Sequence, residues 1–165
     1  ADVVAYLKMF TLLSREEIGA LEQAVAAEPF KRAAQKALAE DVTRRVHGAE
    51  GLARALQATE ALFGGDLAGL GADDLADIFA DVPSSEVSRD ALAGDGTALV
   101  DLLETTDLAS SKGDARRAIE GGGMYVNNVR VEDVDHRVRS ADALEGRFVV
   151  LRKGKKRYHV VSVGA

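Results

Sequence analysis

The sequence of 165 residues contains no cysteine, no tryptophan and only two prolines. Without cysteine the chain can form no disulfide, no thiolate metal site and no cysteine nucleophile, a composition that fits a reducing compartment, the cytoplasm. Aromatic residues make up only 5% of the chain, so its core must be built mainly from alanine, leucine and valine. No apolar run approaches the roughly 20 residues that a membrane-spanning helix needs, and we expect no membrane partner.

The N-terminal stretch ADVVAYLKMFTLL also lacks the basic segment that opens a secretory signal. It has no initiator methionine and starts in the middle of an amphipathic pattern. We therefore expect a chain whose beginning is missing.

Charge is distributed unevenly along the sequence. Residues 1–109 contain 9 Lys and Arg against 20 Asp and Glu, whereas residues 110–165 contain 12 against 7. The net charges of −11 and +5 account for the overall charge of −6. Such an asymmetry indicates nucleic-acid contact through the basic half. The acidic half also contains a basic island, formed by Lys31, Arg32, Lys36, Arg44 and Arg45.

The acidic part of the chain is predicted to be helical. Apolar residues at helical spacing predict a helix over 3–13, and Ser14 with Glu17 matches the capping box that would open a second helix over 14–26. Pro29 suits the first turn of the next helix. Further helices are expected over 30–46, over 49–63, and from residue 72 to a point before Pro83, because glycines and proline punctuate the pattern there.

The polar, glycine-containing residues 84–97 are interpreted as a linker between two domains, 1–93 and 94–165. Beyond it we expect short helices over 99–103 and from Ser111 to about Glu120, then a hairpin that turns at Asn127–Asn128. Two further strands should meet near Lys153-Gly154. The predicted fold class is therefore α+β, a small α-helical domain followed by a compact α+β domain.

No catalytic constellation can be found in the sequence. There is no phosphate-binding P-loop, and Gly94-x-Gly96 lacks the third glycine and the preceding strand of a dinucleotide-binding fingerprint. The three histidines, His47, His136 and His159, are far apart and share no metal-ligand spacing. We therefore predict no catalytic residue and no metal site.

The first candidate binding segment runs from Ser110 to Arg117. Lys112 and Arg116 are four residues apart, so they share one helix face near an N-terminus, where unpaired N–H groups attract phosphate. Arg117 adds a third cation. The same pattern fits a capped helix with a solvated cationic face equally well, so this segment alone leaves both readings open.

The second candidate segment places five cations in six residues at an expected hairpin tip. They are Arg152, Lys153, Lys155, Lys156 and Arg157. Like charges at this density repel one another, but at a tip they concentrate positive potential where a polyanion can reach it. We favour RNA contact over a solvated turn, because a solvated hairpin would usually mix charge signs. Tyr158, which follows, either stacks on a base or belongs to the core.

The stretch LVDLLETTDLASSKGDARRAIEGGGMYVNNVRVEDVDHRV resembles the S-four-like RNA-binding domain, which takes its name from a small-subunit ribosomal protein. The resemblance rests on a Leu-rich helix, a turn ending in Ser-Lys, a helix with Ala-Arg-Arg, and a hairpin. The hairpin departs from the family at Asn128, where Gly is usual. Gly113 lies where many relatives carry a polar or charged residue.

Four other segments resemble, in the same order, the C-terminal part of bacterial tyrosyl-tRNA synthetases: YLKMFTLLSREEI, KRAAQKALAEDVTRRVHG, ALFGGDL and EGRFVVLRKGKKRYHVV. The resemblance implies a parent enzyme of the class I aminoacyl-tRNA synthetases, which activates tyrosine with ATP and transfers it to tRNA(Tyr). Its HIGH-like and KMSKS-like motifs are absent from this chain. ATP and tyrosine would bind a missing catalytic domain, which would also make most of the homodimer contacts. No cofactor is expected in this chain.

On this resemblance, residues 1–93 would hold the anticodon arm and residues 94–165 would form the S-four-like domain. The basic island of residues 31–45 is the weaker candidate, because Glu40 and Asp41 lie close to it in sequence. The main alternative is a stand-alone, non-catalytic RNA-binding or ribosome-associated factor, which would have no need of the helical half. An RNA-modifying enzyme is the second alternative, and the lack of convergent catalytic residues counts against it.

Overall fold

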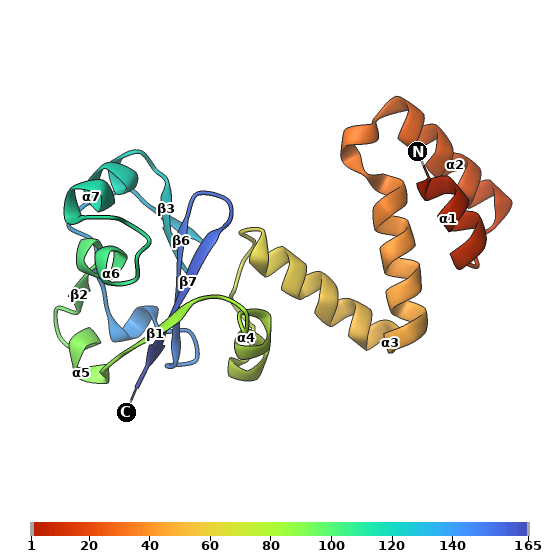
Figure 1. Ribbon diagram of the computed structural model, residues 1–165. Helices are drawn as coiled ribbons and strands as arrows, with labels where there is room; N and C mark the ends of the chain where they lie inside the picture. Colours follow the sequence, from red (N-terminus) through yellow and green to blue (C-terminus); the bar gives the residue numbers. More distant parts are fainter. Residues whose placement is uncertain (1, 165) are drawn as a thin grey trace. The chain divides into compact units, whose positions relative to one another are not determined.

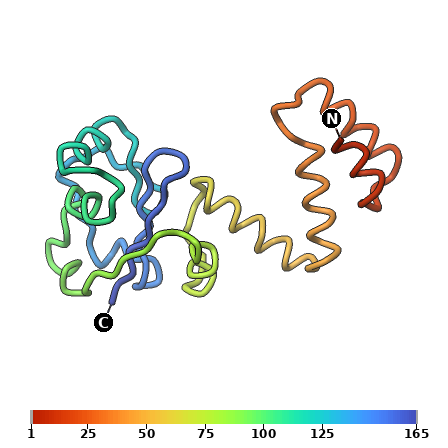
Figure 2. The backbone as a smooth tube through the Cα atoms, in the orientation of Figure 1, coloured from red at the N-terminus to blue at the C-terminus, as the bar shows by residue number. Residues whose placement is uncertain are grey.

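The computed structural model describes residues 2–164. The chain divides into two compact units, the first ending at Gln57 and the second beginning at Ala58. Each unit is described by itself (Figure 1, Figure 2). None of the helices within residues 2–164 is long and apolar enough to cross a membrane.

The first unit consists of helices. They are α1 (Val3–Phe10), α2 (Arg15–Ala27), the 3-10 turn η1 (Pro29–Lys31) and most of α3 (Ala33–Leu62). The capping box is confirmed: the Ser14 hydroxyl accepts the backbone N–H of Glu17, and the Glu17 carboxylate accepts that of Ser14. Val3, Leu7, Ile18 and Ala34 form a small core that the helices bury between them.

Helix α3 joins two helices that the sequence pattern separates. At Gly48 the backbone is non-helical, with φ at 76° and ψ at 179°. Glycine adopts this positive φ without the steric cost that a side chain would bring. The predicted break at His47-Gly48 is therefore confirmed. The last helical residues of α3, 58–62, belong to the second unit.

The second unit is built on a five-stranded sheet in the order β1-β7-β6-β3-β4. Its strands are β1 (Ser84–Val87), β3 (Met124–Val126), β4 (Val129–Val131), β6 (Phe148–Lys153) and β7 (Arg157–Val163). All neighbours pair antiparallel except β1 and β7, which are parallel. A separate two-stranded ladder joins β2 (Thr97–Ala98) to β5 (Arg137–Val138).

The helices of this unit are short. They are α4 (Ala72–Ile78), α5 (Arg89–Leu92), α6 (Leu99–Thr105), α7 (Lys112–Glu120) and the 3-10 turn η2 (Ser140–Asp142). The predicted hairpin is confirmed, because β3 and β4 are joined by Asn127 and Asn128, whose φ values are 49° and 62°. Positive φ at both central residues is the signature of the type I′ turn that matches strand twist. The α+β fold class is confirmed as well.

Both faces of the sheet are covered, because side chains of β6 alternate between two cores. Val149 and Leu151 pack in a cluster with α6 and α7. Val150 packs on the opposite side, in a cluster that contains Ala61 of α3 and Leu75 of α4. Figure 1 shows α6 and α7 on one side of the strands and α4 with the end of α3 on the other.

The interpretation of residues 84–97 as a linker is wrong. Residues 84–87 form β1, which pairs in register with β7 and places Ser85 beside Val161. Within α5, Leu92 is fully buried. A strand at the edge of a sheet forms hydrogen bonds with one neighbouring strand only and needs few apolar residues. Its sequence pattern is therefore hard to distinguish from that of a loop. The structure therefore places the division after Gln57, because residues 58–82 cover the sheet, and not at the predicted position between residues 93 and 94.

Candidate nucleic-acid interface

Helix α7 begins as predicted, and its cations lie on the surface. The Ser111 hydroxyl accepts the backbone N–H of Asp114 at 3.2 Å, which caps the first turn. Lys112 is exposed and forms an ion pair with Asp101 at 2.9 Å, and this hydrogen bond raises the pKa of Lys112. Arg116 and Arg117 are also exposed, and within residues 2–164 neither side chain forms an ion pair or hydrogen bond.

The turn between β6 and β7 carries a second group of cations. Lys155 and Lys156 are exposed at its tip and make no ion pair within the described part of the chain. Arg157 is exposed too, but its guanidinium donates to the backbone carbonyl of Asp107 at 2.9 Å. Gly154 turns the chain with a φ of 65°.

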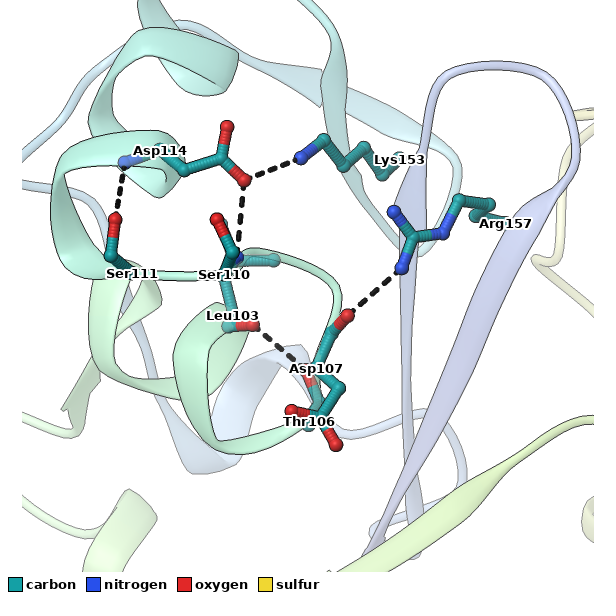
Figure 3. A network of polar contacts seen from close by, with 8 residues as sticks. All are labelled: Leu103, Thr106, Asp107, Ser110, Ser111, Asp114, Lys153 and Arg157. Carbon is teal, nitrogen blue, oxygen red and sulfur yellow. Dashed lines mark hydrogen bonds and ion pairs between the residues drawn. The ribbon is translucent and has the colours of Figure 1, made fainter.

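A polar network fastens this turn to the start of α7 (Figure 3). The Lys153 ammonium lies 2.9 Å from the Asp114 carboxylate, and the same carboxylate accepts the backbone N–H of Ser110 at 3.1 Å. The Lys153 hydrogen bond first, and the Ser110 bond second, hold the pKa of Asp114 below its ordinary value. Together with the bond from Arg157 to Asp107, this network joins the two candidate segments.

We call the resulting cationic area the basic surface. It consists of the α7 cations and those of the adjoining turn, namely Lys112, Arg116, Arg117, Lys153, Lys155, Lys156 and Arg157. Its cations differ in how far they are already neutralised. Lys112 and Lys153 each form an ion pair with an aspartate, whereas the two lysines at the tip, Lys155 and Lys156, form none within residues 2–164.

The prediction that Arg152 is an exposed phosphate contact is wrong. Its exposed fraction is 7%, and its guanidinium lies 3.6 Å from the centroid of the Tyr125 ring. It donates to the Asn128 side-chain oxygen at 2.9 Å and to the Gly154 carbonyl at 2.6 Å. The cause is the alternation of β6, which places Arg152 on the same face as Val150. Tyr158, left open between core and base stacking, is a core residue.

Asn128, which stands where Gly is usual in the family, has a structural role that the sequence pattern does not predict. Its side-chain amide donates to the carbonyls of Ala61 and Gly65, each at 2.9 Å. The Ala61 carbonyl lies in the last turn of α3, where helical acceptors lose their partners, and Gly65 follows three residues after the end of this helix. Asn128 thus caps α3 while its oxygen holds Arg152.

The basic island of the first unit is less organised. Lys31 pairs with Glu28 at 2.8 Å, and Arg45 pairs with Asp41 at 3.0 Å. The remaining members, Arg32, Lys36 and Arg44, are exposed and form no ion pair within residues 2–164. All five stay candidate RNA contacts.

A groove of about 790 Å³ adjoins the basic surface. Sequence reasoning missed it, because its walls come from segments far apart in the chain. They include Phe63, Pro83, Leu108 and the turn cations Lys155, Lys156 and Arg157. His159 also lines it, 3.0 Å from the Ser85 hydroxyl, and burial lowers the pKa of this histidine. Among residues 2–164, no cluster of His, Asp and Glu could hold a metal ion.

Comparison with known proteins identifies the family. The family model described as "Tyrosine--tRNA ligase SYY-like C-terminal domain" matches residues 74–161, more than half of the chain. The chain belongs to this family. A second model, "tRNA synthetases class I (W and Y)", matches residues 1–64. The resemblance stated from the four sequence segments is thereby confirmed.

Several tyrosine–tRNA ligases are similar to this member of the family over nearly its whole length. That of Roseiflexus castenholzii is 55% identical over 161 residues, which are 98% of this chain and 38% of the relative. That of Geobacillus stearothermophilus is 48% identical over 97% of this chain and 37% of the relative. The chain thus spans well under half of the length of these relatives.

A solved structure, "Solution structure of tyrosyl-tRNA synthetase C-terminal domain", is also similar. It is 40% identical with a TM-score of 0.48, and the match covers 63% of this chain and 100% of that one.

Proposed function

We propose that this chain is the tRNA-binding part of a tyrosine–tRNA ligase and that its basic surface contacts the phosphate backbone of tRNA(Tyr). One observation carries the proposal: Lys153 and Arg157 fasten the β6–β7 turn to the start of α7 and the loop before it. Two cationic segments, far apart in sequence, thereby form one surface. Phosphate contacts fix the position of a bound nucleic acid and supply most of its salt-dependent affinity.

The cations take graded roles in this proposal. Lys155 and Lys156 bind phosphates most strongly, because neither forms an ion pair with a carboxylate within residues 2–164. Arg116 and Arg117 act in the same way from α7. Lys112 and Lys153 contribute less to phosphate binding, because each already forms an ion pair with an aspartate. The basic island of the first unit, Lys31, Arg32, Lys36, Arg44 and Arg45, contacts the anticodon arm.

The proposal extends to the enzyme that the relatives' names describe. The whole protein activates tyrosine with ATP and transfers it to tRNA(Tyr), acting as a homodimer in the cytoplasm. ATP and tyrosine bind outside this chain, in the part of the relatives that it does not span. This part of the proposal is supported by identity of 55% to a tyrosine–tRNA ligase across 98% of the chain.

A salt series of filter-binding measurements with a tRNA(Tyr) transcript tests the proposal. The double variant Lys155→Ala/Lys156→Ala should bind more weakly and flatten the slope of log affinity against log salt by up to about 2. The matched control Arg54→Ala/Arg89→Ala removes the same charge outside the basic surface and should change little. Circular dichroism checks that each variant is folded. Unchanged affinity and slope in the lysine variant would contradict the proposal.

A further inference from the structure

The groove beside the basic surface exposes an aromatic ring. Phe63 follows the last residue of α3, and its exposed fraction is 77%. The apolar part of the groove wall also includes Leu62, Val82, Pro83 and Leu108. A large apolar ring is normally removed from water on folding, because its exposure is unfavourable. Phe63 stays in solvent although a cavity of about 790 Å³ lies against it, and this volume lies in the range of small-ligand sites, about 300–1,000 Å³.

The charges around this groove select the kind of occupant. Lys155, Lys156 and Arg157 are among its lining residues and supply three adjacent cations. An occupant must therefore combine a flat apolar face with a negative charge. A nucleotide whose base is unpaired has both, because every base presents a π-face and every nucleotide a phosphate.

Two carboxylates in the lining narrow the choice of base. Asp81 and Asp107 both line the groove and are exposed. They repel a phosphate, but a carboxylate accepts hydrogen bonds from an exocyclic amino group such as N4 of cytosine. The aspartates therefore favour a base that carries an exocyclic amino group over one that carries none.

We propose that this groove binds one unpaired, amino-bearing nucleotide of the tRNA, with its base stacked on Phe63 and its phosphate held by Lys155, Lys156 and Arg157. The inference rests on the proposed function and adds base recognition to the phosphate contacts. It assigns a binding role to Phe63, which lies outside both cationic segments.

Because the chain contains no tryptophan, the variant Phe63→Trp introduces one indole as a reporter. The full 165-residue chain is titrated with a tRNA(Tyr) transcript, and binding is followed independently by the anisotropy of a labelled tRNA. Stacking should quench the emission of the indole and shield it from acrylamide. Val129→Trp is the matched control, because Val129 is 69% exposed and does not line the groove. Its indole should remain unquenched.

A second variant separates stacking from charge. Phe63→Leu keeps an apolar side chain but removes the ring, and should weaken tRNA binding by about fivefold to a hundredfold without altering the salt slope. The lysine double variant should alter the slope. If tRNA binds but the indole at 63 is neither quenched nor shielded, or Phe63→Leu binds like the parent chain, the groove assignment is overturned and the basic surface stands. If the parent chain binds no tRNA, both proposals are overturned.

Discussion

The guanidinium of Arg152 lies over the Tyr125 ring, 3.6 Å from its centroid. Its Nε donates to Asn128, whose amide caps the carbonyls of Ala61 and Gly65. One buried arginine thus connects β6, the β3–β4 turn and the end of α3. The charge of Arg152 stabilises the fold, whereas the charges of Lys155 and Lys156 on the turn face solvent.

Arg152→Ala should therefore destabilise the second unit. It removes the charged donor of a half-buried hydrogen bond to the Asn128 oxygen, and a hydrogen bond that involves a charged group contributes about 1.5–3 kcal/mol. Arg152→Lys should also be destabilising, because an ammonium lacks the planar fork that stacks and bonds at once. Urea unfolding measures the change. The control Lys155→Ala should stay within about 0.5 kcal/mol of the parent, and an equal loss in both variants would refute this role.

Replacement of Asp114 should strengthen RNA binding. Asp114→Asn releases the Lys153 ammonium, while the amide oxygen can still accept the backbone N–H of Ser110. The bond from Arg157 to the Asp107 carbonyl still holds the turn in place. The slope of log affinity against log salt should steepen by up to about 1, because one more cation is available to a phosphate. Filter binding of the tRNA(Tyr) transcript measures it. Glu145→Gln removes one carboxylate elsewhere and is the control, and an unchanged or flatter slope for Asp114→Asn would argue against the prediction.

Mild acid should destabilise the second unit through His159. Burial lowers the pKa of His159 below 6.5, its ordinary value, although Asp107 partly opposes the shift. The unfolded chain then binds a proton more readily than the folded one. The stabilising contribution is present above pH 6.5 and is lost as the pH falls from there through the lowered pKa. His159→Gln keeps a hydrogen-bonding group near Ser85 and should reduce the fall in melting temperature between about pH 7.5 and about pH 5.5. An identical fall in both proteins would exclude this histidine as the cause.

Limited trypsin digestion should leave the segment beside β1 uncut at first. Arg89 is the first residue of α5 and lies two residues after the end of β1, whose pairing with β7 holds this segment in the second unit. Arg44, Arg45 and Arg54 are exposed on α3 on either side of the non-helical Gly48. We expect cleavage at these three sites before cleavage at Arg89, because a structured segment must open locally before a protease can cut it, and mass spectrometry identifies the products. A first cut at Arg89 would restore the interpretation of residues 84–97 as a linker.

The features that the sequence predicted correctly are local ones. The capping box of Ser14 and Glu17 and the turn at Asn127–Asn128 depend on residues within a few positions of one another. The break at Gly48 and the cap of α7 at Ser111 follow the same rule. The clustering of charge and the four family segments could also be found without coordinates, because they depend on the order of residues alone.

Tertiary structure decided everything that required a partner distant in the chain. Residues 84–87 became a strand because β7 offered hydrogen bonds to them, and no pattern within four residues encodes that partner. Arg152 became a buried stacking residue because strand alternation turned it toward Tyr125, while Lys155 and Lys156 beside it remained in water. A run of cations records how much charge a segment carries. Only the packing around it decides which of those charges a ligand can reach.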